Sequence, residues 1–340
     1  MTKERYFLTS VTRNSDLDSV PFDVDLLPRS RWAAGDFVVG EVLTTPRYET
    51  ELDSGRMILN MKGDLLVGAF GKRSATLEGV GDWEQIDTDL RMQSLTGAGL
   101  FGKATSKSPF MPDWLELRYR GHVIRDDSKV TMMQFARAGG DAKLQIPVIL
   151  VVGTSMSAGK TTTGRIMIHE LTRAGLRVGG AKLTGASRYR DILSFLDAGA
   201  AAVFDFVDVG LPSTVCSADQ YRECLRQLLG VIAGYQLDVL VAEAGASPLE
   251  PYNGEIAIRE LGERIRCTVL CASDPYAVVG VKMAFNLRPD LVAGPATATA
   301  AATALVRRLS GLYALDLTDR ANMSPLRRLL ADRLGLAVPV

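Results

Sequence analysis

The sequence predicts an α/β protein in which a doubly wound parallel-sheet domain follows a smaller β-rich domain. Two observations indicate this fold class. Up to about residue 135, short strand-like runs are separated by Gly, Asp and Pro. From residue 147 onward, six apolar runs alternate with helix-like segments. The length of 340 residues also favours two domains over one.

The apolar runs of the C-terminal part predict six strands. The first, PVILVVG, is continuously apolar, which is typical of a parallel strand covered on both faces. A helix is predicted from residue 159 to residue 174, with Gly175 as its C-terminal cap. The six strands are expected at residues 147–153, 176–185, 201–208, 237–245, 265–274 and 290–295.

In the N-terminal part, runs such as DFVVGEVLTT and WLELRYRGHVI predict short strands of a small barrel or sandwich. The segment ARAGGDAKLQIP mixes small, flexible and charged residues and is the expected linker. We therefore predict a β-rich domain at residues 1–136, a linker at 137–146 and an α/β domain at 147–340. The glycine-rich segment 95–110, with Lys103 and Lys107, has two equal interpretations: a loop that binds an anion, or a mobile surface hairpin.

Composition excludes several classes of function. Lys plus Arg and Asp plus Glu both number 39, so no excess charge points to nucleic acid or a membrane surface as a partner. The first residues, MTKERYFLTSVTRNSD, lack the apolar core of a secretory signal. The four cysteines show no Cys-x-x-Cys spacing and are read as buried free thiols rather than a metal site, which favours a cytoplasmic setting.

The stretch GTSMSAGKTTTG, residues 153–164, resembles the phosphate-binding pattern G-x-x-x-x-G-K-[ST]. Gly159, Lys160 and Thr161 match its second half, but Thr154 stands at the first glycine position. The difference is tolerable because backbone N–H groups and the helix N-terminus grip the phosphates. Lys160 is expected to reach the β and γ phosphates, and Thr161 to ligate Mg²⁺. The predicted nucleotide-binding loop comprises Gly153, Thr154, Ser155, Met156, Ser157, Ala158, Gly159, Lys160, Thr161 and Thr162.

Charged residues follow the predicted strands, at the edge where open parallel sheets bind ligands. These residues are Lys160, Lys182, Asp205, Asp208, Glu243 and Asp274. Any one of them also has a plain reading as a solvated side chain. Together they predict a site in which Thr161, Asp205 and Glu243 are the candidate metal ligands.

The loop GTSMSAGKT resembles the G-T-x-x-x-x-G-K-T loop of the dethiobiotin synthetase family of P-loop NTPase-like proteins. The segment VAEAGASPLEP, residues 241–251, is similar to the family's V-E-G-A-G-G motif, with Glu243 at the Mg²⁺-binding position. Ala244 and Ala246 stand where the family has glycine. Lys182, in AKLTG, resembles the family's strand-end lysine. The likeness covers about residues 147–310, and it implies catalytic roles for Lys160, Lys182 and Glu243 and a homodimer.

Several other residues are candidates for ligand contact. Asp274 and Pro295 lie where the nucleotide base is expected, and a carboxylate at 274 suits guanine. Ser213, with Thr214, has a second reading as the cap of a helix that starts near Ser217. The predicted substrate-binding residues are Thr184, Asp208, Ser213, Gly245, Ala246, Ser247 and Asn253.

The sequence thus predicts an ATP- and Mg²⁺-dependent ligase or kinase that phosphorylates a small carboxylate, carbamate or similar acceptor. The expected partner is a small-molecule substrate, with no nucleic acid and no membrane. One alternative is an N-acyltransferase that uses the loop for the phosphates of acetyl-CoA. It rests on a looser likeness, at the loop and at Asp205 and Phe206, to two-domain bacterial P-loop proteins linked to D-amino acid N-acylation. The other alternative is a regulatory NTPase.

Overall fold

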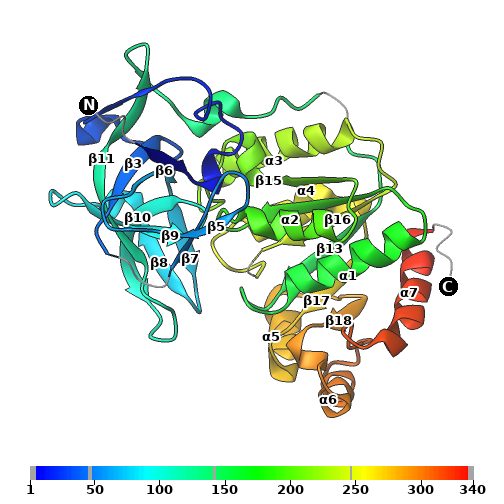
Figure 1. Cartoon of the computed structure of the whole chain (residues 1–340). Coiled ribbons are helices and arrows are strands. Elements are labelled where there is room, and N and C mark those ends of the chain that lie inside the picture. The colour runs from blue at the N-terminus through cyan, green and yellow to red at the C-terminus, as the bar shows by residue number, and fades with distance from the viewer. Residues whose placement is uncertain (1–4, 45–47, 141–142, 246, 336–340) are drawn as a thin grey trace. The chain divides into compact units, whose positions relative to one another are not determined.

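The computed structural model describes residues 5–44, 48–140, 143–245 and 247–335. The chain forms two compact units, and many of their elements are labelled in Figure 1. The first unit extends to Ala138 and includes two later segments, Ala186–Arg190 and Phe206–Cys224. The second unit comprises Gly139–Gly185, Asp191–Asp205 and the chain from Leu225 onward. The linker at residues 137–146 and the domain limits stay a prediction.

The first unit is built of short strands and 3-10 turns, as its sequence rhythm predicts. Its strands are β1 (Tyr6–Leu8), β2 (Asp23–Asp25), β3 (Phe37–Val42), β4 (Glu49–Glu51), β5 (Met57–Leu59), β6 (Leu65–Phe70), β7 (Lys72–Ala75), β8 (Gly79–Asp82), β9 (Arg91–Thr96), β10 (Leu100–Lys107), β11 (Leu115–Arg125) and β12 (Ser128–Lys129). Strands β6, β3, β11, β9 and β10 pair in that order, and β10 pairs again with β6. The five strands therefore close into a ring, the arrangement of a small barrel.

Large apolar side chains fill this unit because inward positions alternate along its strands. Trp32, Phe70, Phe101 and Tyr119 belong to one buried cluster. The segment 95–110 is not a free hairpin, because half of it is β10, which pairs with β6, β8 and β9 and whose first three residues are buried. Lys107 at its end pairs with Asp113 at 2.5 Å.

The second unit contains six parallel strands, which confirms the predicted sheet. They are β13 (Val148–Gly153), β14 (Val178–Thr184), β15 (Ala202–Asp205), β16 (Val239–Ala244), β17 (Ile265–Cys271) and β18 (Leu291–Ala293). Their order across the sheet is β15-β14-β16-β13-β17-β18. Every residue of β13, β14 and β16 is buried, as their apolar runs predict for central strands covered on both faces.

Seven helices connect or flank these strands within the described ranges of the chain. They are α1 (Lys160–Arg173), α2 (Tyr189–Asp197), α3 (Ala218–Ala233), α4 (Gly254–Leu261), α5 (Pro275–Phe285), α6 (Ala300–Ser310) and α7 (Met323–Leu334). Helix α1 follows β13 directly and packs on β13, β14 and β16 (Figure 1). Two 3-10 turns carry residues that the sequence analysis singled out: Phe206–Val209 after β15, which contains Asp208, and Pro295–Thr297 after β18, which begins with Pro295.

All four cysteines are free, as predicted, and Cys224, Cys267 and Cys271 are buried. The prediction of burial is wrong for Cys216, which is only partly buried. Burial raises the pKa of Cys271 to about 12, so its thiol stays protonated at neutral pH. No cluster of three or more His, Cys, Asp or Glu suited to a metal ion occurs among the residues that the structure describes. In the same ranges, we find no helix with the length and apolar character needed to cross a membrane.

Candidate phosphate-binding site

The loop between β13 and α1 has the backbone form that a phosphate-binding loop requires. Gly153 ends β13, and Lys160 begins α1. Gly159 has a φ of 85°, a left-handed conformation that favours glycine. The backbone after β18 lies against the loop, because a Cβ added at Gly294 would stand 2.4 Å from the carbonyl oxygen of Ala158. The N–H groups at the start of α1 have no partner within the helix and suit an anion.

Thr154, which stands at the first glycine position, fixes the loop to the strand beside it. Its backbone N–H donates to the carbonyl oxygen of Cys271 at 3.0 Å. Its hydroxyl oxygen accepts from the backbone N–H of Ser273 at 3.1 Å. The threonine thus supplies a side-chain tether between the loop and the end of β17, which a glycine has no atoms to form.

Lys160 is folded onto its own loop. Its side chain is only 3% exposed, and Nζ donates to the carbonyl oxygens of Ser155 at 2.6 Å and Met156 at 3.3 Å. Burial lowers the pKa of Lys160, although Glu243 and Glu250 act in the opposite direction. These carbonyl oxygens satisfy the buried ammonium, since an unpaired buried charge is costly.

Thr161 and Glu243 meet across two adjacent elements. The Thr161 hydroxyl donates to Oε2 of Glu243 at 3.0 Å. Glu243 lies near the end of β16, which pairs with β13, so the acid is next to the strand that carries the loop. Burial raises the pKa of Glu243, while Lys160 and Lys182 lower it. The carboxylate is 3% exposed and therefore lies in a place where a cation is needed to favour its charged form.

We predict that Glu243 makes the Mg²⁺-free protein less stable as pH rises. Because burial raises its pKa, the folded protein binds this proton more tightly than the unfolded chain. The stability contribution is complete below the ordinary carboxylic pKa and is lost as pH rises through the higher folded pKa. Urea unfolding at several pH values should give a shallower decline for Glu243→Gln than for the unchanged protein. Identical pH slopes in these two proteins would contradict the prediction, and the exposed Glu263→Gln is the control.

Lys182 lies between two carboxylates at the same sheet edge. Its Cα pairs in register with that of Glu243 on β16 and that of Asp205 on β15. Neighbouring strands lie about 4.8 Å apart and residues in register point to the same face. Lys182 Nζ also forms an ion pair with Asp191 of α2 at 2.6 Å. Burial alone lowers its pKa, but Asp191, Glu243 and Asp205 outweigh burial and the pKa is raised, so the ammonium stays charged.

The oxygen donors at this edge fit Mg²⁺, which takes one or two protein oxygens beside phosphate and water. The hydroxyl of Thr161 and the carboxylate of Glu243 are close enough for one ion to take the place of the hydrogen bond between them. Asp205 is fully buried and lies one strand beyond Lys182. Its register favours a role beside that lysine, and its predicted role as a metal ligand stays a prediction.

The other predicted substrate-binding residues of the second unit lie around the end of β16. The Thr184 hydroxyl donates to the carbonyl oxygen of Gly245 at 3.2 Å, and a Cβ at Gly245 would stand 2.3 Å from the carbonyl oxygen of Thr184. Ala246 lies outside the described residues. Ser247 donates its N–H to Glu250 at 2.6 Å. Asn253, with a φ of 63°, precedes α4. These residues shape the loop that follows Glu243.

Two predicted substrate residues belong to the first unit, while the loop belongs to the second. Asp208 forms an ion pair with Arg13 at 3.1 Å and accepts from Asn14 at 3.1 Å. Ser213 accepts from the backbone N–H of Val215 at 3.1 Å. The side chain that accepts from the first turn of α3 is Ser217, through the N–H of Gln220, and not Ser213. The substrate roles of Asp208 and Ser213 stay predictions.

Asp274 and Pro295 both begin helical turns. The carboxylate of Asp274 accepts from the backbone N–H groups of Tyr276 at 2.8 Å and Ala277 at 3.0 Å, so it is the N-cap of α5. These hydrogen bonds, that from Ala277 above all, lower the pKa of Asp274. Pro295 is the first residue of a 3-10 turn. A capping role thus explains Asp274 without a purine base.

We predict that Asp274→Ala lowers the free energy of unfolding by about 1 kcal/mol, the usual effect of losing an N-cap. Asp274→Asn should keep most of the stability, because an amide oxygen also accepts from the helix N–H groups. Urea unfolding measures both. If Asp274→Asn instead changes the preferred nucleotide from GTP to ATP and leaves the free energy of unfolding unchanged, the base-reading role is correct.

Sequence reasoning missed two acids of this site. Asp191 forms an ion pair with Lys182, and Glu250 raises the pKa of Lys160 by its charge. Glu250 lies within the segment VAEAGASPLEP, so the motif itself contains a second acid that could have been a candidate. Asp191 lies in the first turn of α2, where an acid is also expected for the helix dipole alone.

No protein-family model matches the chain, and no curated protein matches its sequence. Among solved structures, a LAO/AO transport system kinase is 13% identical, with a TM-score of 0.39, over 60% of this chain and 62% of that chain. The hydrogenase maturation factor HypB from Archaeoglobus fulgidus is 14% identical, with a TM-score of 0.36, over 54% and 90%. The signal recognition particle receptor FtsY from Elizabethkingia anophelis is 15% identical, with a TM-score of 0.32, over 54% and 61%.

The chain therefore spans about three fifths of the transport kinase and of FtsY. Likenesses at these TM-scores carry no conclusion about activity. The second unit is characterised by its own strand order, its glycine-containing loop before α1 and the acid on the neighbouring strand.

Proposed function

We propose that the second unit binds ATP with Mg²⁺ and transfers the γ-phosphoryl group to a carboxylate, carbamate or similar group of a small molecule. The observation that carries this proposal is the arrangement of charge at one sheet edge. Thr161 directly follows the loop lysine and lies 3.0 Å from a buried acid, Glu243, whose register partner is a second buried lysine, Lys182.

Binding begins at the loop. The free N–H groups at the start of α1 and the helix dipole favour phosphate oxygens. Lys160 exchanges the carbonyl oxygens of Ser155 and Met156 for oxygens of the β and γ phosphates. This exchange needs only a turn of the lysine side chain, since the ammonium already lies inside the loop.

Thr161 and Glu243 are the residues that would hold Mg²⁺, which supplies charge neutralisation between the β and γ phosphates. This arrangement also accounts for the burial of Glu243. A carboxylate with a pKa raised by burial is stabilised in its charged form by a nearby cation.

In the transfer step, an oxygen of the acceptor attacks the γ-phosphorus and the bond to the β–γ bridging oxygen breaks. The products are ADP and an acyl phosphate. Lys182 neutralises negative charge on the acceptor or on the phosphoryl group in flight, and its raised pKa keeps it cationic. An amine then attacks the acyl carbon, loses a proton and releases phosphate. Such catalysis is mainly positioning and electrostatic stabilisation.

The likeness of GTSMSAGKT and VAEAGASPLEP to dethiobiotin synthetase motifs supports the choice of a carboxylate or carbamate acceptor. It also supports a homodimer, which light scattering of the purified protein tests. We propose a small metabolite as the acceptor, and the equal numbers of basic and acidic residues give no indication of a nucleic acid instead.

A hydroxylamine trap tests the proposal, because hydroxylamine converts acyl phosphates to hydroxamates. The protein is incubated with ATP, Mg²⁺, hydroxylamine and a panel of small mono- and dicarboxylic acids, or with diamines and bicarbonate. The proposal is supported if hydroxamate forms only in the presence of ATP and of one particular acceptor, and only when Lys160 is intact. ADP release that no acceptor changes indicates a regulatory NTPase instead. Stabilisation by acetyl-CoA but not by ATP with Mg²⁺ would overturn the proposal in favour of acyl transfer.

A further inference from the structure

A pocket lies on the outer side of α1, away from the strands that α1 covers. Its volume is about 770 Å³, within the range of pockets that hold small organic ligands. All of its lining residues belong to the second unit. They come from α1, the end of α2 and the chain from Leu317 to Arg327, and the charged or titratable ones include Arg165, His169, Arg173, Asp197, Arg320 and Arg327.

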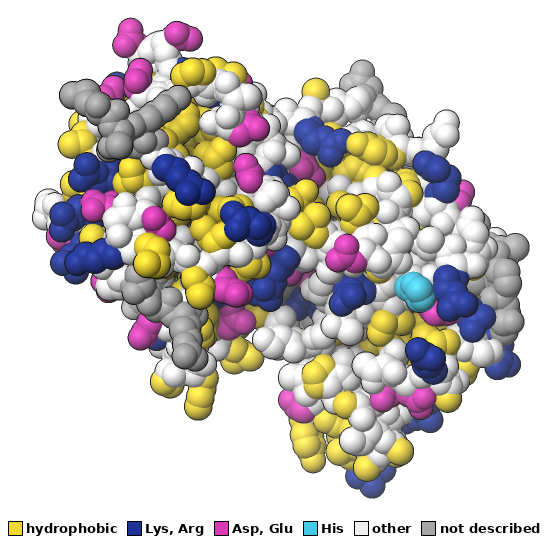
Figure 2. All heavy atoms as spheres, in the orientation of Figure 1, with side chains coloured by type: hydrophobic (Ala, Val, Ile, Leu, Met, Phe, Trp, Pro, Cys, Tyr) yellow, Lys and Arg dark blue, Asp and Glu magenta, His cyan; other side chains and the backbone are white. Residues whose placement is uncertain are grey.

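The pocket is rich in positive charge that the protein leaves uncompensated. The side chains of Arg165, Arg173 and Arg320 are exposed, and none has an ion pair or hydrogen bond within the described part of the chain. Arg327 is paired, at 3.2 Å, with Glu170. Figure 2 shows basic side chains gathered near the exposed histidine of this face.

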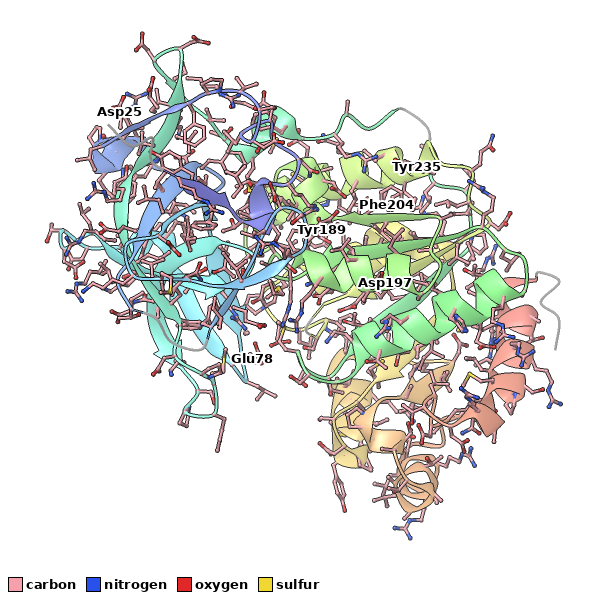
Figure 3. The ribbon with its side chains drawn as sticks, viewed as in Figure 1. Asp25, Glu78, Tyr189, Asp197, Phe204 and Tyr235 are labelled. Atoms are coloured by element: carbon pink, nitrogen blue, oxygen red, sulfur yellow. The ribbon has the colours of Figure 1, made fainter. Side chains whose placement is uncertain are left out.

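This concentration is local, because basic and acidic residues balance over the whole sequence at 39 each. Four arginines line the pocket, against the two acids Glu170 and Asp197. Figure 3 shows Asp197 at the end of α2, near α1. A concave surface with one excess sign of charge attracts ligands of the opposite sign.

The spacing of α1 explains how one helix builds both sites. Thr162, Arg165, Ile166, His169 and Arg173 recur at intervals of three or four residues, so they share one helix face. Met167, Ile168 and Leu171, on other faces of the same helix, are fully buried. The basic face is thus directed away from the sheet, and among the pocket's lining residues only Thr162 also belongs to the predicted nucleotide-binding loop.

We propose that this pocket binds a small organic molecule that carries two phosphate groups. A guanidinium group donates two parallel hydrogen bonds to a phosphate, so three unpaired arginines are enough to bind both phosphates. The apolar side chains of Ile166, Leu317 and Met323 also line the pocket and contact the carbon skeleton of the ligand. The proposal rests on the pocket's own residues and not on nucleotide binding by the loop.

Calorimetric titration with fructose 1,6-bisphosphate and with inorganic pyrophosphate tests this inference. The full-length Lys160→Ala protein is used, so that the loop does not compete for the probe. We expect saturable binding of one equivalent of at least one probe, weakened by added salt. Arg165→Gln and Arg320→Gln should each weaken binding about tenfold or more, as expected for a charge-assisted hydrogen bond.

Arg308→Gln is the matched control, because Arg308 is exposed on α6, has no polar contact among the described residues and lies outside the pocket. Its affinity for the probes should equal that of the parent protein. Circular dichroism shows whether each variant is folded. Absence of saturable binding for both probes, or equal affinity in the pocket variants and in Arg308→Gln, would overturn the inference. Neither result bears on ATP binding, which is measured separately in the unchanged protein.

Discussion

Replacing Lys160 by Ala is expected to slow phosphoryl transfer by about 10²- to 10³-fold, the effect of removing one preorganised charge at the reacting group. The variant should also lose stabilisation by ATP and Mg²⁺, since a ligand stabilises only the state that binds it. The side chain is 3% exposed, and its ammonium donates to the loop carbonyl oxygens of Ser155 and Met156. Its charge also favours the ionised form of Glu243, so the unliganded variant's own unfolding temperature is the baseline for its thermal shift. Transfer rates and thermal shifts with and without ATP measure both effects.

Lys143→Ala is the control for this variant. Lys143 is exposed, has no polar contact among the described residues and belongs to the same unit. Its thermal shift with ATP and Mg²⁺ should match that of the unchanged protein. If Lys160→Ala keeps the full ATP-dependent shift, the nucleotide binds elsewhere and the assignment of the loop is wrong.

Replacing Glu243 by Gln is expected to lower turnover by about 10²-fold or more while nucleotide affinity changes little. The amide keeps the shape of the side chain and still accepts from the Thr161 hydroxyl, so the local structure should persist. It removes the negative charge that pairs with Mg²⁺. Because burial raises the pKa of this acid, turnover that requires the ionised form should also rise with pH in the unchanged protein.

Steady-state rates at saturating ATP, with the Mg²⁺ concentration varied, measure this prediction. Affinity is measured separately with a non-hydrolysable ATP analogue. The control is Glu263→Gln, which changes an exposed acid of the same unit. Equal losses of turnover and of nucleotide affinity in Glu243→Gln would indicate a structural role for the acid rather than a role in metal-assisted transfer.

The parallel sheet and its loop are predictable from the sequence because their signals are local. A continuous apolar run such as 147–153 marks a strand covered on both faces, and a glycine before Lys-Thr marks a phosphate-binding turn. That Lys182, Glu243 and Asp205 lie at one edge also follows from the rule that parallel strands end at the same edge, whereas their register across the sheet is known only from the structure.

Long-range pairing is what the sequence does not reveal. No sequence pattern near Asp208 indicates that its ion-pair partner is Arg13, which lies 195 residues earlier. The carboxylate of Glu51 accepts from the backbone N–H groups of Tyr189 at 2.8 Å and Arg190 at 2.7 Å, and this contact helps to place residues 186–190 in the first unit.

A helix-capping role is equally hard to predict from the sequence when the residue has two plausible roles. Asp274 stands where a base-reading acid is expected, and it also precedes a proline-started helix, for which an N-cap is the local requirement. The ion pair between Lys182 and Asp191 depends on where α2 packs, which no short-range pattern fixes.

A crystal structure of the protein with Mg²⁺ and a non-hydrolysable ATP analogue tests most directly the central claim, that the loop before α1 binds the phosphates of ATP. We predict that the β and γ phosphates lie against the backbone N–H groups of residues 156–161. Lys160 Nζ should leave the Ser155 carbonyl for a phosphate oxygen, and Thr161 and Glu243 should flank the metal. An analogue bound elsewhere, with Lys160 still hydrogen-bonded to Ser155, would contradict the account.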